Sequence, residues 1–83
     1  MASVERTTSF AKEMLDFLAS SPTPQQIVDL RVSAEVQQRM SLLLEKNRKG
    51  KITAEEKREL EENLRLERFM AALKSRVRRK QAE

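Results

Sequence analysis

Hydrophobic side chains recur every three or four residues near the start of this chain, which is the spacing of an amphipathic α-helix. Between residues 8 and 19 the repeat consists of Phe10, Met14, Phe17 and Leu18. Ser20-Ser21-Pro22 follows it, and the residue before a proline is pushed away from helical angles. The pattern therefore predicts a first helix over residues 8–19.

Two more helix starts follow within fifteen residues. Thr23-Pro24 is typical of an N-cap followed by proline at the first helical position, where the missing N–H costs nothing. It predicts a short helix over residues 24–30. Ser33 is the next N-cap candidate and predicts a helix over about residues 34–48. The expected apolar face of that helix is made of Val36, Met40, Leu43 and Leu44, with Leu42 on the opposite side.

The segment EKNRKGKITAEE, residues 45–56, predicts a turn between two helices. Gly50 stands where a helix C-terminus favours a left-handed residue. Thr53 and Glu56 have the spacing of a capping box, which marks a helix N-terminus. The third and fourth helices are therefore expected to form an antiparallel hairpin.

The same twelve residues have part of the spacing of an EF-hand calcium loop, because Gly50, Ile52 and Glu56 fall where that loop has them. However, Lys49 occupies a position that should supply an oxygen ligand, and Arg48 and Lys51 flank it. A divalent cation would meet three positive side chains there. We expect no calcium binding and no other metal site.

The fourth helix is predicted over about residues 54–80 and has two apolar facets that point in different directions. The early facet, Leu60 and Leu64, suits contact with the helix over residues 34–48. The late facet consists of Leu66, Phe69, Met70, Leu73 and Val77. Three candidates can cover this late facet: the helix over residues 8–19, a second copy of the chain, or another protein.

Composition narrows the function further. The chain has 83 residues, of which 39% are hydrophobic and 36% charged, and this size suits a single small domain over residues 1–83. Cys and His are both absent, so disulfides, thiolate sites and zinc sites built on imidazole are excluded. The carboxylates near residue 55 suit a helix N-terminus, and no nucleophile or phosphate loop accompanies them. We expect neither an enzyme nor a cofactor.

Positive charge is concentrated at the end of the chain. Residues 1–41 have a net charge of −1 and residues 42–83 a net charge of +5, of which +4 lies in residues 74–83. This basic tail contains Lys74, Arg76, Arg78, Arg79 and Lys80. Such cations can neutralise phosphates, although no aromatic residue lies among them for base stacking. Nucleic-acid binding through the tail is one hypothesis, and its alternative is a solvated tail or a tail that contacts an acidic protein.

The sequence gives no sign of a membrane segment or a leader. No apolar run approaches the ~20 residues that a membrane span needs. The first nine residues lack the basic-then-apolar layout of a signal peptide. A cytoplasmic protein with residues 1–7 disordered is the expectation.

Residues 20–79 resemble a family of small, largely uncharacterised bacterial proteins that are common in cyanobacteria. The resemblance rests on SPTPxxI at Ser21–Ile27, on Asn47-Arg48 with Gly50 and Thr53, and on Leu66-Glu67 with Met70 and Leu73-Lys74. Some members of this family are antitoxin-like, and the resemblance implies a protein partner of that kind. It transfers no catalytic or binding residue to this chain.

Taken together, these patterns predict an all-α bundle built on a long antiparallel hairpin, with an N-terminal helix and a short helix packed on it. The predicted function is non-catalytic protein–protein interaction, antitoxin-like or adaptor-like. The partner, or a second copy in a homodimer, would contact the late facet. The alternative is a nucleic-acid-binding protein that acts through the basic tail.

Overall fold

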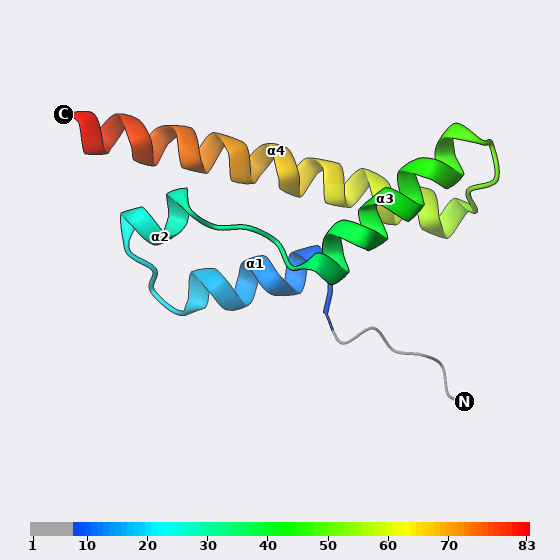
Figure 1. Cartoon of the computed structure of the whole chain (residues 1–83), viewed down its shortest axis with the longest axis horizontal. Helices are drawn as coiled ribbons and strands as arrows, with labels where there is room; N and C mark the ends of the chain where they lie inside the picture. The colour runs from blue at the N-terminus through cyan, green and yellow to red at the C-terminus, as the bar shows by residue number, and fades with distance from the viewer. Residues whose placement is uncertain (1–7) are drawn as a thin grey trace.

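The computed structural model describes residues 8–83, so the disorder predicted for residues 1–7 lies outside the described residues. Four helices follow one another along the chain (Figure 1): α1 (Phe10–Ala19), α2 (Pro24–Val28), α3 (Ala34–Arg48) and α4 (Ala54–Ala82). The predicted all-α fold and the predicted order of helices are confirmed. Helix ends differ from the prediction by two residues at most.

Each helix begins at a side chain that satisfies a free backbone N–H group. Ser9 accepts a hydrogen bond from the Lys12 N–H group, so α1 begins at Phe10 and not at Thr8. Thr23 and Thr53 each start a capping box, in which Gln26 and Glu56 bond back to the cap residue. Ser33 accepts from the Val36 N–H group.

The turn between α3 and α4 also forms as the sequence predicts. Gly50 has a φ of 71°, in the left-handed region where a side chain is disfavoured. The Lys51 N–H group donates to the Lys46 carbonyl at 2.9 Å, which closes the last turn of α3. A substitution at Gly50 would strain this turn although nothing lies close to the position.

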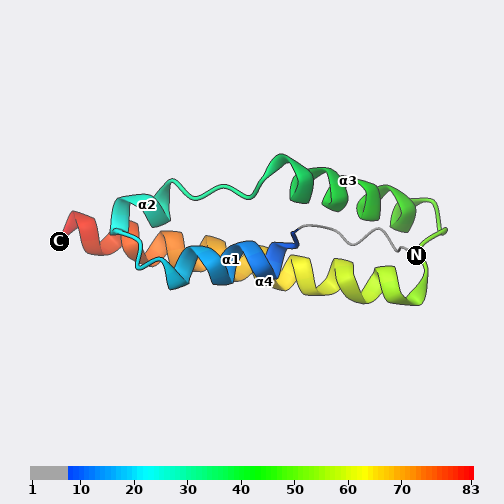
Figure 2. The same cartoon turned by 90° about the horizontal axis from the view of Figure 1, so that it is seen from below.

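Helix α4 is the axis of the molecule. Its 29 residues make a rod of about 43 Å, and α1, α2 and α3 each pack mainly against it rather than against one another. Helix α3 lies beside the N-terminal half of α4, as the predicted hairpin requires, while α1 lies beside the middle of α4 and α2 beside its C-terminal part (Figure 2). Helix α1 runs in the same direction as α4.

Two small hydrophobic clusters stabilise this arrangement. The cluster at the hairpin end contains Met40, Leu43 and Leu60, with Ile52 and Leu64 packed against them. The cluster under α1 contains Phe10, Met14 and Val36, with Val32, Leu66 and Met70 packed against them. The early facet of α4 therefore contacts α3, as predicted, and α1 covers part of the late facet.

Two leucines that the helical repeat places in the core are in fact partly exposed. Leu44 has 47% of its surface exposed and Leu18 has 38%. Each lies about 80° around its helix from the first residue of its repeat, Val36 or Phe10. Because α1 and α3 each pack mainly against one helix, α4, only a narrow face of either helix is buried. Leu42 is exposed, as predicted.

Candidate interaction surface

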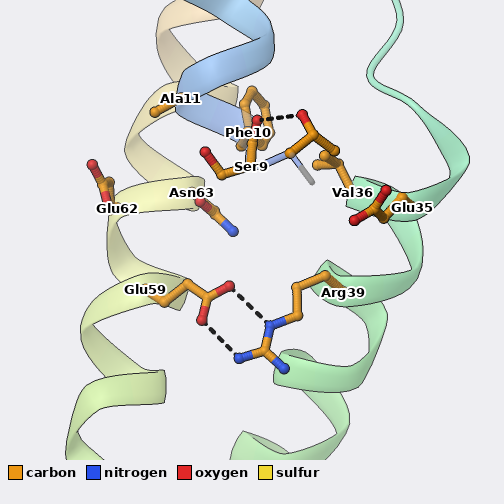
Figure 3. Close-up of a pocket in the computed structure, with 10 residues that line it drawn as sticks. Ser9, Phe10, Ala11, Glu35, Val36, Arg39, Glu59, Glu62 and Asn63 are labelled. Atoms are coloured by element: carbon orange, nitrogen blue, oxygen red, sulfur yellow. Dashed lines mark hydrogen bonds and ion pairs between the residues drawn. The ribbon is translucent and has the colours of Figure 1, made fainter. Parts of the chain in front are cut away.

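Charged side chains clamp α3 to α4 at the middle of the hairpin (Figure 3). The Arg39 guanidinium donates to both carboxylate oxygens of Glu59, at 2.9 and 2.8 Å, with about a quarter of each side chain exposed. The bond to Glu59 raises the pKa of Arg39 further. Between this pair and the start of α1 lies a cavity of about 150 Å³. We interpret the Arg39–Glu59 ion pair as a structural contact between α3 and α4, since each charged group is already paired with the other.

Glu56 combines two roles at the start of α4. One carboxylate oxygen accepts from the Thr53 N–H group at 3.0 Å, and the other accepts from the Lys46 ammonium at 2.6 Å. The bond from Lys46 is the main reason why the pKa of Glu56 falls from 4.5 to about 2. The same side chain thus caps α4 and joins it to α3.

This depressed pKa predicts an acid-sensitive contact. A carboxyl whose pKa is lower in the folded state stabilises the fold above its unfolded pKa, and that contribution disappears as pH falls through the folded value. For Glu56 the loss spans pH 4.5 down to about 2. We expect Glu56→Gln, which keeps the capping box, to lose less stability over this range than the wild type. Urea unfolding of both proteins from pH 6 to pH 2 measures the difference, and parallel profiles would contradict it.

Glu45, the first carboxylate of the turn, forms ion pairs with cations of the same segment. Arg48 and Lys49 contact Glu45 at 2.6 and 3.1 Å, and the bond from Arg48 is the main cause of its lowered pKa. Glu45 and Glu56 are the two end carboxylates that an EF-hand reading of the turn requires. Both are bound to cations of the chain itself.

Glu13 fixes the position of α1 relative to the start of α3. It accepts from the Ser33 N–H group at 2.9 Å and from the Thr8 hydroxyl at 3.1 Å. Partial burial raises the pKa of Glu13, but these hydrogen bonds outweigh it and the pKa is lowered. The edge of α1 that contains Glu13 therefore faces α3, and the opposite edge faces away from it.

The structure divides the predicted partner-binding facet of α4. Leu66 and Met70 pack against the cluster under α1. Leu73 and Val77 are half-buried, and Val77 lines a shallow hollow beside α2. Phe69 is different, because 53% of its surface is exposed. Of the five residues of this facet, Phe69 is therefore the most accessible to a partner.

Two leucines of α1 are exposed on the same side of the molecule as Phe69. Leu15 and Leu18 have 68% and 38% of their surfaces exposed. On α1, Leu15 and Leu18 lie one and two turns after Ala11, so they share its edge of the helix, opposite Glu13. On α4, Phe69 lies two turns after Glu62 and therefore shares the side of Glu62. Figure 3 shows Ala11 and Glu62 together on the side away from α3. We call Leu15, Leu18 and Phe69 the outer flank.

Sequence reasoning identified only part of the outer flank. Phe69 was predicted as a contact residue, Leu18 was expected in the core, and Leu15 was not singled out. The available signal for Leu15 is its spacing, three residues before Leu18 and four after Ala11, which places all three on one edge of α1.

The predicted basic tail is helical to Ala82, and its cations point in several directions. The Lys74 ammonium donates to the Leu30 carbonyl, so this residue ties α4 to the segment between α2 and α3. Arg76 and Lys80 border a hollow of about 370 Å³ whose apolar wall includes Ile27. The tail cations Arg76, Arg78, Arg79 and Lys80 are exposed.

Comparison of the chain with protein-family models, with curated proteins and with solved structures gives no match. In the part of the chain that the structure describes, none of the helices is both long and apolar enough to cross a membrane.

Proposed function

We propose that this protein is a non-catalytic interaction module whose outer flank binds a segment of another protein. The observation that carries the proposal is the exposure of Leu15, Leu18 and Phe69 on one side of the α1–α4 pair. Scattered exposed leucines are ordinary on small proteins, but neighbouring apolar side chains of two helices form the kind of patch that marks a binding site. An exposed phenylalanine adds the type of residue that is enriched in interfaces.

The charges around the outer flank indicate the chemistry of the partner. Arg65 and Arg76 lie four residues before and seven residues after Phe69, so they border it on the same side of α4. Neither makes an ion pair within residues 8–83. The fitting partner therefore presents an apolar segment edged by Asp or Glu.

The same charges argue against a second copy of the chain. A two-fold contact through the outer flank would bring the patch of one copy onto the same patch of the other. Arg65 and Arg76 of both copies would then approach one another, with a net charge of +4 on each chain. Like charges placed together in this way oppose association.

The family resemblance suggests how this protein acts on such a partner. Antitoxin-like and adaptor-like proteins both act by covering or joining another protein, and neither role requires catalytic groups in this chain. A helical rod with one apolar flank suits either role, because a helix or an extended segment of a partner can pack on exposed apolar side chains of this kind.

The proposal can be tested by capture combined with site-specific crosslinking. Full-length chain carrying a benzoylphenylalanine photo-crosslinker at position 69 is expected to form one stoichiometric product in lysate of the source organism. The crosslinked peptide should be apolar and bordered by Asp or Glu. The double variant Leu15→Gln/Phe69→Gln should capture at least tenfold less of that partner in a pull-down.

The matched control is Leu42→Gln/Leu44→Gln, which changes two exposed leucines of α3. It should capture the partner as well as the wild type does. Crosslinking to a second copy of the chain would overturn the proposal. So would equal losses of partner in the two double variants.

A further inference from the structure

A row of arginines runs along the solvent-facing side of α4. Its members, which we call the arginine stripe, are Arg58, Arg65, Arg68, Arg76 and Arg79. At about 100° per residue, all five fall within an arc of about 80°. The arc lies outside the sectors of α4 that face α1 and α3, and all five residues are exposed. From Arg58 to Arg79 the stripe is about 32 Å long.

Within residues 8–83, carboxylates offset only part of the positive charge of the stripe. In α4, Glu56 pairs with Lys46 and Glu59 pairs with Arg39, so both acids are turned toward α3. Among residues 8–83, no ion pair involves an arginine of the stripe. Between Arg58 and Arg79, Glu61 is the one acid in the same arc. The fold therefore separates charges that alternate along the sequence.

We infer that the arginine stripe binds the phosphate backbone of duplex nucleic acid. The guanidinium group is a planar fork that can bond two phosphate oxygens at once. A duplex presents one negative charge per ~1.7 Å of its axis, and one helical turn is about 34 Å. A straight row of about 32 Å therefore matches one turn of duplex. This inference goes beyond the proposed function, because it concerns a different class of partner and a face of α4 that adjoins the outer flank, with Arg65 and Arg76 on the border between the two.

A duplex fits the stripe better than a single strand does. Sites for single strands stack successive bases on aromatic rings. Phe10 is buried and Phe17 is half-buried, so Phe69, at the edge of the stripe, is the one largely exposed ring in residues 8–83. Contacts to phosphates alone position a protein on a duplex without reading its sequence.

The stripe also corrects the view that basic character belongs to the tail alone. Arg58, Arg65 and Arg68 precede residue 74, whereas Lys74 is bonded to Leu30 and Arg78 lies outside the arc. If the stripe and not the tail binds the duplex, Arg78 should contribute less to duplex binding than Arg65 does.

The test is fluorescence anisotropy with a labelled 20-base-pair DNA duplex at several salt concentrations. The stripe variant is Arg65→Gln/Arg68→Gln/Arg79→Gln. The control variant is Arg31→Gln/Lys51→Gln/Arg78→Gln, which removes the same charge from exposed positions outside the stripe. Glutamine is a good helix former, and circular dichroism should show equal helicity in both variants.

We expect the stripe variant to lose at least about tenfold in affinity at low salt and its salt slope to fall by about 3. The control should stay within about threefold of the wild type. Equal losses in both variants, or absence of wild-type binding at low salt, would overturn the inference. So would tighter binding of a single strand of the same length. Competition by polyglutamate or by phosphatidylglycerol vesicles as strong as that of unlabelled duplex would overturn it as well.

Discussion

Leu43→Ala is expected to lower the free energy of unfolding by about 2–5 kcal/mol. Leu43 has no exposed surface and lies at the centre of the cluster that joins α3 to α4. Its removal deletes buried methyl groups and leaves a cavity that Met40 and Leu60 cannot fill without moving. A domain of this size has a total stability of roughly 4–12 kcal/mol, so this loss would remove a large fraction of it.

Urea unfolding followed by far-ultraviolet circular dichroism measures this loss. The matched control is Leu42→Ala, one residue earlier, where 45% of the side chain is exposed. The same chemical change there should cost less than about 1 kcal/mol, as expected away from the core. Similar losses at both positions would mean that α3 is rotated from the orientation described above.

Phe10→Ala is expected to cost about 3–5 kcal/mol, the range for a buried aromatic side chain. Phe10 is 3% exposed and packs with Met14 and Val36 under α1. Helix α1 has only ten residues, which is too short to be stable alone in water. Losing this contact should therefore release α1 from α4 before the hairpin unfolds.

Amide hydrogen exchange distinguishes local release of α1 from uniform destabilisation. In Phe10→Ala, amides of α1 should exchange faster than those of α3, whose contacts with Leu60 and Glu59 remain. Leu15→Ala is the control on the same helix, because Leu15 is 68% exposed, and it should leave exchange unchanged. Equal acceleration in α1 and α3 would show that the two clusters unfold as one unit.

Local chemistry explains why the helix boundaries could be predicted from the sequence. Ser33, Thr53 and Gly50 determine helix ends through bonds to neighbours within five residues. Such bonds depend little on the rest of the fold, so a short motif contains the information needed.

Which side of a helix is buried could be predicted only in part, because that depends on where other helices lie. The repeat in α3 was expected to bury Leu44 with Leu43, yet α3 contacts only one large partner and buries a narrower stripe. The late facet of α4 is divided for a similar reason, with Met70 under α1 and Phe69 beyond its edge.

The two proposed surfaces also depend on tertiary arrangement. The sequence shows the periodic arginines of α4, but acids alternate with them, which suggests mutual neutralisation within the helix. In the folded chain Glu56 and Glu59 pair with cations of α3, which leaves Glu61 as the one acid of α4 between Arg58 and Arg79 in the arc of the stripe. Likewise, the outer flank combines residues about fifty positions apart in the chain, and α1 must pack beside α4 before they meet.

The central claim is that the outer flank is an open binding surface and not part of the core. Urea unfolding of Leu15→Gln/Phe69→Gln tests this claim most directly, without any partner present. Because both side chains are more than half exposed, the free energy of unfolding should stay within about 1 kcal/mol of the wild type. A loss of about 3 kcal/mol or more, comparable to Phe10→Ala, would place these side chains in the core and contradict the account.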